Sequence, residues 1–439
     1  MVNEGKFGVA LVGCGIVGGG TARVLTEDIE YLQERTGIPF YLKYVVDKNF
    51  DNARSIAVPE NLYEEDFNKV IADPDVFLVV ELIGGLTVAK KIMTKALEAG
   101  KHVVTANKAL LAHYGPELFA LARKEKVSIG FEASCGGGIP IIKALTDGLL
   151  ANRIEAMFGI VNGTCNHILT EMTEKGQSYK SALQSAQKAG LAEADPTLDV
   201  TGMDSAHKLT IMGSLAFGER VNLDSIPVQG IDTLDLYDIK TARDLGYIMK
   251  LLAVARRTDK GLALSVSPCL LHTSHPLARV SGAFNAVSVY GHAVGHTMYM
   301  GRGAGSSPTA SAVVSDIIAT ALGITPKAFE TLTFWPDRTK PAVQLPPADI
   351  ISRYYLRFMV QDRPGTVARI SAILSEYGIS ITALQQKEET SAIIPVVMTT
   401  HEAGEGAVIK ALAAIETLEE VIESPYMIRI VEEHPEKVI

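Results

Sequence analysis

An acidic and a basic residue four positions apart are the first candidates for chemistry in this sequence. Asp204 and Lys208 close a polar stretch that starts at Ala189, and the residues after Gly202 predict a helix. Side chains at i and i+4 share one helix face, so the carboxylate can orient the ammonium and keep it protonated. Such a lysine can donate a proton to an oxygen that gains negative charge. The alternative is an ordinary surface ion pair.

A second lysine follows a short apolar run. Thr105-Ala106-Asn107-Lys108 comes directly after residues that predict a buried strand. Open α/β sheets bind ligands at the carboxyl ends of their strands. Lys108 is therefore a candidate proton donor or electrostatic clamp beside a carbonyl oxygen, and a solvated lysine at a helix start is an equal alternative.

A glycine-rich turn predicts the cofactor. Gly13-Cys14-Gly15-Ile16-Val17-Gly18 lies between an apolar run at 7–12 and a helical pattern at 17–33. The first glycine permits the tight turn, the second lets the backbone approach a pyrophosphate, and the third lets the helix pack on the strand. In this context the turn predicts dinucleotide binding, with a bare packing turn as the alternative.

The acidic residue after the second predicted strand indicates which dinucleotide binds. Asp47 can accept hydrogen bonds from ribose hydroxyls, which favours NAD, whereas Lys48 could accommodate the 2′-phosphate of NADP. The gap from Gly18 is longer than usual and requires a long helix and loop. We predict NAD, with Asp47 as a simple loop cap as the alternative.

Two further turns could bind small ligands. Backbone carbonyls in the turn at 132–140, together with Glu132, could hold a monovalent cation. Cys135 has no histidine partner nearby in sequence and is better explained as a small apolar residue. The turn Asp362-Arg363-Pro364-Gly365 precedes a predicted helix, whose first amides could receive a carboxylate. The alternative there is a dimerising module with an empty turn.

These candidates fall on an α/β chain with three predicted domains. Strands alternating with helices over 1–134 predict a Rossmann nucleotide-binding domain, and 303–334 is expected to pack back on it. Residues 135–302 predict an α+β domain for substrate binding, catalysis and dimerisation, in which 241–256 is expected to be helical. The proline-rich segment 335–350 predicts a linker. Residues 351–434 predict a ferredoxin-like βαββαβ unit.

The composition restricts the class of protein. A formal charge of −9 argues against a nucleic-acid partner, and no long apolar stretch predicts a membrane span. The 4 cysteines are too few and too scattered for a disulfide framework. We therefore expect a cytoplasmic protein.

Taken together, the motifs resemble those of homoserine dehydrogenase over almost the whole chain. The resemblance is carried by residues 9–15, 103–108, Asn162-Gly163-Thr164 and, most specifically, 190–208. Residues 353–431 look like an ACT domain, an amino-acid-sensing module. The chain is similar to the monofunctional bacterial form with a C-terminal ACT domain, without a fused aspartate kinase.

The resemblance implies the interconversion of L-aspartate 4-semialdehyde and L-homoserine with NAD(P)H, in threonine, methionine and isoleucine biosynthesis. It implies that Lys208 donates the proton and that Lys108 contacts cofactor and substrate. Glu193 would bind the amino end of the substrate, and Asp199 and Asp204 would belong to the polar site around it. One departure is that Val46 stands where many relatives have arginine. That difference argues against a strong NADP preference.

The resemblance also implies ligands outside the reaction itself. A sodium ion would be bound by Glu132, Cys135, Gly137 and Ile139, three of them through backbone carbonyls. An amino-acid effector, with threonine the first candidate, would bind near the turn that begins at Asp362. A homodimer is expected, or a tetramer through paired ACT domains, and truncation after the linker is expected to leave a folded dehydrogenase.

Two rival functions remain open at this point. Another Rossmann–ACT dehydrogenase, such as phosphoglycerate dehydrogenase, would carry its glycine turn in mid-chain and an Arg/Glu/His catalytic set. A catalytically silent amino-acid sensor would have no need to retain Glu193, Asp199, Asp204 and Lys208 together.

Overall fold

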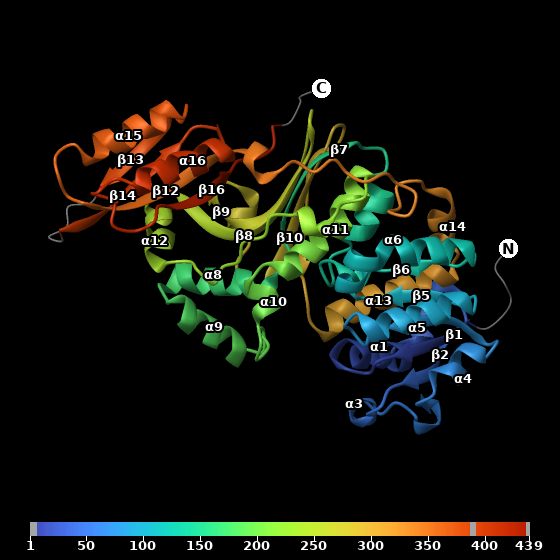
Figure 1. The fold of residues 1–439 in the computed structure, drawn as a ribbon. Coiled ribbons are helices and arrows are strands. Elements are labelled where there is room, and N and C mark those ends of the chain that lie inside the picture. The colour runs from blue at the N-terminus through green and yellow to red at the C-terminus, as the bar shows by residue number, and fades with distance from the viewer. Residues whose placement is uncertain (1–6, 387–391, 436–439) are drawn as a thin grey trace.

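The computed structural model of this protein describes residues 7–386 and 392–435. Two sheets, joined by the helices between them, form the frame of the molecule (Figure 1). Residues 1–6, which belong to the predicted first domain, lie outside the described residues, as do Lys387 and Ser391 at the predicted ends of two C-terminal strands.

The first sheet has six parallel strands in the order β3-β2-β1-β4-β5-β6. In this doubly wound order the topology switches between β1 and β4, and a ligand crevice opens at the carboxyl ends of the strands. Every residue of β1 is buried, as expected for a parallel strand covered on both faces. The strands are β1 (Phe7–Val12), β2 (Phe40–Val46), β3 (Tyr63–Glu64), β4 (Val76–Glu81), β5 (His102–Thr105) and β6 (Ile129–Gly130).

The helices of this half differ slightly from the predicted ones. The single helix predicted over 17–33 is two helices that meet at Asp28, whose backbone ends the first and begins the second. The helices are α1 (Ile16–Glu27), α2 (Ile29–Thr36), α3 (Asp51–Ser55), α4 (Phe67–Ala72), α5 (Thr87–Glu98) and α6 (Lys108–Lys124).

The chain returns to this half after the middle segment. Helix α13 (Ser306–Ala321) packs along α1, where the Ser306 hydroxyl donates to the Ile16 carbonyl at 2.8 Å. A Cβ at Gly20 would lie 2.4 Å from the Ser306 oxygen, so the close approach depends on that glycine. Helix α14 (Ile324–Thr331) follows. Within the described residues no single helix is long and apolar enough to cross a membrane, and only the bent pair α13–α14 passes that test by length and composition.

The second sheet begins with five antiparallel strands in the middle of the chain. Helices α8, α11 and α12 pack on β8, and α9 and α10 pack on α8 (Figure 1). The strands are β7 (Ile154–Ile160), β8 (Tyr247–Thr258), β9 (Gly261–His272), β10 (Phe284–Gly291) and β11 (Gly295–Arg302). The helices are α7 (Ile141–Lys143), α8 (Gly163–Lys175), α9 (Tyr179–Lys188), α10 (Thr197–Val200), α11 (Met203–Phe217) and α12 (Leu236–Asp244).

The helix predicted over 241–256 is wrong. Helix α12 ends at Asp244, Gly246 turns the chain with φ +84°, and residues 247–258 form β8. Seven consecutive residues in the middle of β8 are buried, because helices cover one face and packed side chains the other. A continuous apolar run of this kind does not show by its periodicity whether it is a helix or a strand.

The C-terminal unit has the predicted βαββαβ order. Tyr354, Phe358 and Ile370 are among the residues of its own hydrophobic core. Its elements are β12 (Ile351–Gln361), α15 (Thr366–Glu376), β13 (Ile381–Gln386), β14 (Ile393–Thr400), β15 (Ala403–Gly404), α16 (Glu405–Glu416) and β16 (Tyr426–Val431).

The C-terminal unit is joined to the middle segment by a shared sheet. Strand β16 pairs in parallel with β9, so the second sheet runs continuously in the order β11-β10-β7-β8-β9-β16-β12-β14-β13. Asp238 of α12 is fully buried and binds both Arg357 and Tyr355 of β12, at 2.8 Å each. The unit is therefore not a module held only by a linker.

The proline-rich segment also packs on the catalytic half. Trp335 is buried against Phe119, Phe131 and Phe329. Further along, Gln344 forms a β-bridge with Leu262 of β9. The segment expected to act as a linker is thus fixed at both of these points.

Candidate active site

A cleft of about 530 Å³ opens between the part of the chain that carries the first sheet and the middle segment that carries β7 to β11. It lies at the carboxyl ends of β4 and β5. Residues from both halves line it, including Val17, Gly85, Asn107 and Lys108 on one side and Glu193, Asp195, Asp199, Asp204 and His207 on the other. A second cavity of about 390 Å³ lies between α6 and α11 and contains none of the predicted site residues.

The glycine turn has the shape that a pyrophosphate requires. Gly13 adopts φ +94°, and a Cβ there would lie 2.8 Å from the backbone at Leu82. A Cβ at Gly18 would lie 2.0 Å from the Gly13 carbonyl oxygen, whereas one at Gly15 would meet no described atom within 4 Å. Helix α1 begins at Ile16 without a side-chain cap, so its first amides are available to an anion.

Asp47 lies beside this turn, as the sequence predicts. Its Oδ2 accepts a hydrogen bond from the Cys14 amide at 2.6 Å, and its Oδ1 accepts one from the Lys48 amide at 2.7 Å. The Asn52 side-chain amide donates to the Cys14 and Gly15 carbonyls. Asp47 and Asn52 therefore hold the glycine turn in place, and the Asn52 contact was not predicted.

The strand ends beside the cleft are tied together by hydrogen bonds. The buried Thr105 hydroxyl donates to Glu81 Oε2 at 2.7 Å, and Glu81 Oε1 accepts from the Ile83 and Gly84 amides. The Asn107 side chain then caps α6, which begins at Lys108. These contacts place the Lys108 side chain at the mouth of the cleft.

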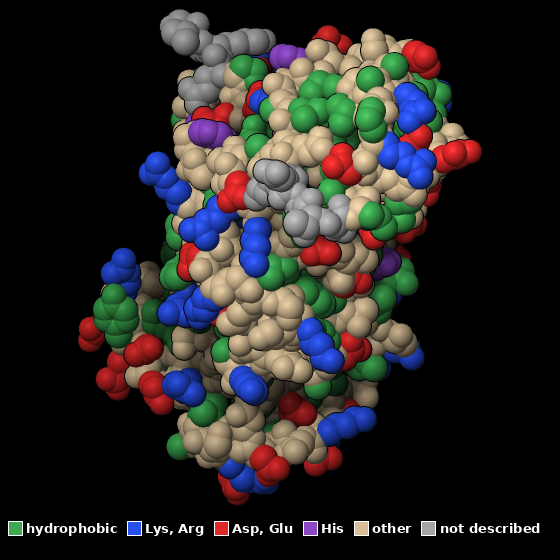
Figure 2. Space-filling view, turned by 90° about the vertical axis from the view of Figure 1, so that its left-hand side faces the viewer, with side chains coloured by type: hydrophobic (Ala, Val, Ile, Leu, Met, Phe, Trp, Pro, Cys, Tyr) green, Lys and Arg blue, Asp and Glu red, His purple; other side chains and the backbone are tan. Residues whose placement is uncertain are grey.

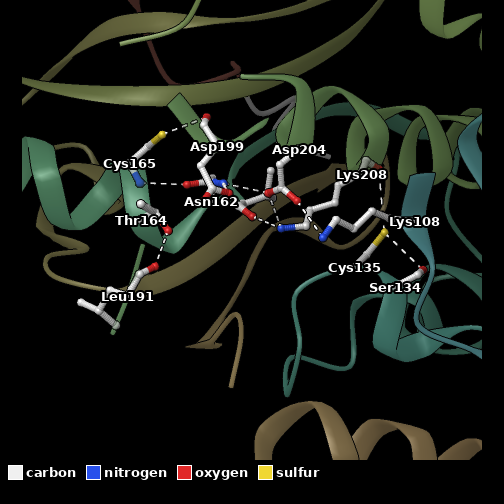
Figure 3. Close-up of polar contacts among 11 residues, drawn as sticks. Lys108, Ser134, Cys135, Asn162, Thr164, Cys165, Leu191, Asp199, Asp204 and Lys208 are labelled. Carbon is white, nitrogen blue, oxygen red and sulfur yellow. Dashed lines mark hydrogen bonds and ion pairs between the residues drawn. The ribbon is translucent and has the colours of Figure 1, made fainter. Parts of the chain in front are cut away.

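A single buried carboxylate joins the two predicted lysines. Asp204 Oδ2 accepts from Lys208 Nζ at 2.7 Å, and Asp204 Oδ1 lies 3.1 Å from Lys108 Nζ (Figure 3). Lys208 Nζ also donates to the Val161 carbonyl at 2.6 Å. Lys108 lines the cleft with 41% of its side chain exposed, whereas Lys208 lies deeper at 10%.

The charges in this cluster stabilise one another. Burial alone would raise the pKa of Asp204, but the Lys208 and Lys108 ammonium groups outweigh it and hold that pKa well below its usual range. Asp204 in turn raises the pKa of Lys108, against the effect of burial. Asp204 is therefore ionised at neutral pH and lies between the Lys108 and Lys208 side chains.

Asp199 joins the cluster through an asparagine. Asn162 Nδ2 donates to Asp199 Oδ1 at 2.7 Å and to Asp204 Oδ2 at 2.9 Å (Figure 3). Burial raises the pKa of Asp199, the bond from Asn162 lowers it, and the Asp204 charge raises it again. Asn162 belongs to the Asn162-Gly163-Thr164 motif, and its contact with the two carboxylates was not predicted.

Glu193 is not drawn into this cluster. Its side chain is exposed at the lip of the cleft, and its backbone carbonyl accepts a hydrogen bond from the Gln187 side chain at 3.2 Å. His207 lines the cleft beside His113, with ring centroids 5.4 Å apart. Burial, with a further contribution from His113, lowers the pKa of His207 to about 4, so this ring is neutral at neutral pH.

The turn predicted to bind a cation lies between β6, the last strand of the first sheet, and α7. Both Glu132 carboxylate oxygens accept backbone amides, from Ile142 and Lys143 at 2.8 Å, and so cap α7. Burial, followed by the charge of Asp316, raises the pKa of Glu132 to about 7. Burial raises the pKa of the Cys135 thiol to about 12, so Cys135 is no nucleophile. In the described chain, no group of three or more His, Cys, Asp and Glu side chains could hold a metal ion.

The predicted effector turn lies far along the chain at the start of α15. Residues 362–365 are exposed, and Gly365 adopts φ +91° where the helix begins without a side-chain cap. None of these residues takes part in the cleft.

The fold and the cleft define a dinucleotide-dependent oxidoreductase with a C-terminal ferredoxin-like domain. Residues 13–132 match the NAD-binding domain of homoserine dehydrogenase, 140–318 match the homoserine dehydrogenase catalytic family, and 354–417 match the ACT domain. The chain belongs to the homoserine dehydrogenase family. It is an NAD(P)-dependent oxidoreductase that interconverts L-aspartate 4-semialdehyde and L-homoserine.

Two known relatives match almost the whole chain, and a third matches most of it. Homoserine dehydrogenase of Neisseria gonorrhoeae is 46% identical and covers 96% of this chain and 98% of its own length. The crystal structure of the Thiobacillus denitrificans enzyme has a TM-score of 0.92 at 43% identity, over 97% of this chain and 98% of that one. A hyperthermophilic archaeal homoserine dehydrogenase, solved in complex with NADPH, matches 72% of this chain over 98% of its own, with a TM-score of 0.60 at 26% identity.

Proposed function

We propose that Lys208 protonates the aldehyde oxygen of the substrate and that Lys108 stabilises the charge developing on it. A dinucleotide whose pyrophosphate binds at the glycine turn would supply the hydride from its nicotinamide. The observation that carries this proposal is that both lysines bind the same buried carboxylate at the cleft. An ammonium has three protons, and Lys208 uses two on Val161 and Asp204, which leaves the third for the substrate.

Lys208→Ala tests this assignment. We expect kcat to fall by about 10²–10⁴-fold, the usual cost of losing a general acid. NADH binding, followed by its fluorescence, should remain. Lys188→Ala, at an exposed position on α9, is the matched control and should behave as wild type. A Lys208→Ala enzyme that keeps more than half of the wild-type kcat would remove this lysine from the mechanism.

We propose that Asp199 and Glu193 bind the ammonium end of the substrate. Asp199 is held at the cleft by Asn162, and the exposed Glu193 lines the lip of the same cleft. Two carboxylates on one wall attract a cationic amino group. Glu193 lies outside the hydrogen-bonded cluster around Asp204. Its carboxylate would therefore bind the substrate and take no part in holding the lysines.

We propose that the cofactor is bound by residues 13–18 together with Asp47, Thr105 and Lys108, and that NAD is preferred. In support, the Asp47 carboxylate is fixed at the end of β2 and would repel a 2′-phosphate. The archaeal relative was solved in complex with NADPH. Lys48, next in the chain, is the residue that could support NADP here.

We propose that a sodium ion binds at the turn formed by Glu132, Cys135, Gly137 and Ile139. Because the Glu132 carboxylate already accepts two amides, backbone carbonyls are the better oxygen donors there. Replacement of sodium by choline at constant ionic strength should lower the melting temperature. An unchanged melting temperature would count against the site.

We propose that an amino acid regulates the enzyme by binding at residues 362–365. The exposed, uncapped start of α15 offers free amides to its carboxylate.

We also propose the domain division 1–134, 135–302, 335–350 and 351–434, with 303–334 belonging to the first domain. The family matches at 13–132, 140–318 and 354–417 support this division.

We propose a cytoplasmic location. The four buried free thiols support it, because free cysteines are typical of a reducing compartment.

We propose a homodimer, with a tetramer formed through paired ACT domains. Both end strands of the second sheet carry exposed apolar side chains, Met298 and Met300 on β11 and Leu384 on β13. Figure 2 shows hydrophobic side chains gathered on the upper part of the face that bears the C-terminal unit. Unpaired apolar edges favour association. Light scattering that gives a monomer mass would contradict this proposal.

A further inference from the structure

Among the residues that the structure describes, Asn162 has a side chain that donates hydrogen bonds to both acidic residues of the cluster, Asp199 and Asp204. It follows β7, begins α8 and is 4% exposed. Its Oδ1 accepts the Cys165 amide at 2.8 Å, which caps α8. That bond fixes which end of the amide faces the cleft, so Nδ2 is directed at Asp199 and Asp204 (Figure 3).

In this arrangement two carboxylates of like charge accept hydrogen bonds from one nitrogen, Asn162 Nδ2. Asp204 has two lysines as partners, whereas Asp199 has no ammonium group within salt-bridge distance in the described chain. A hydrogen bond donated to a carboxylate favours its ionised form. Loss of the Asn162 donor would therefore affect Asp199 more strongly than Asp204.

The same chain segment also holds the second lysine. Val161, the residue before Asn162, accepts Lys208 Nζ through its carbonyl. Two consecutive residues at the end of β7 thus fix the orientation of Lys208 and of both carboxylates (Figure 3).

We propose that Asn162 is a positioning residue for the dehydrogenase reaction, whose one side-chain amide holds Asp199 in register with Asp204 and Lys208. The inference rests on the proposed role of Asp199 in binding the substrate amino group. Asn162 acts through the carboxylates and does not contact the reacting atoms. Its effect is therefore expected on homoserine binding more than on the chemical step.

Asn162→Asp is the informative substitution. Aspartate retains the helix cap on α8 but replaces the donor with a third negative charge. We expect kcat/KM for homoserine to fall about 10- to 100-fold, from the loss of a hydrogen bond to a charged group. Most of the fall should be a rise in the homoserine KM, with the KM for the cofactor unchanged.

The pH profile distinguishes positioning from a general structural role. Because the Asn162 bond lowers the pKa of Asp199, its removal raises that pKa. If the ionised carboxylate binds the substrate, the acid limb of kcat/KM then moves to higher pH. A purely structural role would lower the melting temperature and leave the acid limb where it is.

Two further variants keep the test decisive. Asn162→Ser retains a cap and can donate to one carboxylate but not to both, so its effect should be intermediate. Asn222→Asp places the same charge at an exposed 3₁₀-helix cap outside the cleft and should change nothing. A kcat/KM within twofold of wild type for Asn162→Asp, with the same acid limb, would overturn the proposal.

Asp199→Asn separates the two layers of the argument. If Asp199→Asn leaves the homoserine KM unchanged while Asn162→Asp raises it, the role of Asp199 in substrate binding is wrong, and so is Asn162 acting through it. If both raise the homoserine KM and the double variant is no worse than Asn162→Asp alone, the two residues act as one unit and the proposal holds.

Discussion

At the scale of single residues, the buried carboxylate of Asp204 sets the charge of the cleft. It keeps two ammonium groups within hydrogen-bond distance in a site that is partly closed to water. The neighbouring His207 stays neutral at neutral pH because it is buried. The two lysines bound to Asp204 are therefore the groups that we propose act on the substrate, which suits a reaction that develops charge on an aldehyde oxygen.

Cofactor choice also belongs to single residues. Asp47→Asn keeps the size of the side chain but removes the charge that we propose faces the ribose. We expect NAD affinity to fall and the gap to NADP to narrow, because repulsion of a 2′-phosphate is relieved. Initial rates with each cofactor, measured as kcat/KM, give the ratio.

Lys48→Ala is the companion variant for cofactor choice. It should weaken NADP binding alone if Lys48 serves the 2′-phosphate, and neither cofactor if it does not. A wild-type enzyme that already prefers NADP tenfold or more would show that the role assigned to Asp47 is wrong.

The sequence predicts the local part of this cluster but not the rest. Asp204 and Lys208 lie one helical turn apart, so their contact follows from helix geometry. Lys108 reaches the same carboxylate from another domain, and Asn162 does so from the end of a strand. Contacts of that kind depend on how the sheets are placed, which a spacing along the chain does not contain.

At the scale of elements, the junction between β9 and β16 determines how the C-terminal unit is attached. Period and turn residues predicted its βαββαβ order, because each piece is local. The pairing of β16 with β9 is long-range and had no signal in the sequence. Beside that junction, Arg429 binds Glu405 with two hydrogen bonds and also donates to Ser267 of β9 at 3.0 Å.

The ion pair between α12 and β12 can be tested by stability. Arg357→Met leaves the fully buried Asp238 carboxylate with Tyr355 as its remaining partner. Breaking a buried pair from one side typically costs about 3–5 kcal/mol. Urea unfolding should show that loss, and adding Asp238→Asn should recover most of it.

An exposed ion pair provides the control for this experiment. Arg54 lies half exposed between Asp51 and Glu60, and Arg54→Met should change the unfolding free energy by less than about 1 kcal/mol. If Arg357→Met is equally mild, the contact between α12 and β12 does not help to hold the C-terminal unit in place.

At the scale of the whole molecule, the shared sheet changes what truncation is expected to do. A chain that ends at Ala348 loses the C-terminal unit, so the edge of β9 and the Asp238 carboxylate lose their cover. The archaeal relative, which matches 72% of this chain over nearly its full length, indicates that a dehydrogenase of this smaller size can fold. We expect the truncated chain to keep dehydrogenase activity with a lower melting temperature, partly restored by Asp238→Asn.

Regulation is the property that truncation should abolish. An effector at residues 362–365 would lie at the end of β12, the strand whose Arg357 and Tyr355 hold Asp238 on α12. Helix α12 packs on α8. In α8 the Cys165 thiol donates to the Asp199 main-chain carbonyl at 3.2 Å, and Asn162, the N-cap of α8, donates to the Asp199 carboxylate. A ligand that binds one arrangement of these elements better than another shifts the equilibrium between them and so changes the cleft. The coupling free energy between two such sites is typically about 1–3 kcal/mol.

Titrating threonine, isoleucine, lysine and methionine separates the possibilities. Inhibition of the full-length enzyme that disappears in the truncated enzyme, at matched activity, would support regulation through the C-terminal unit. The Arg357→Met enzyme should bind the amino acid but respond to it less, because the contact that links β12 to α12 is cut. If no amino acid changes the activity of the full-length enzyme, the unit serves to complete the sheet and to join subunits. If the truncated chain with Asp238→Asn still fails to fold, the sheet of the catalytic half requires β16 as a permanent strand.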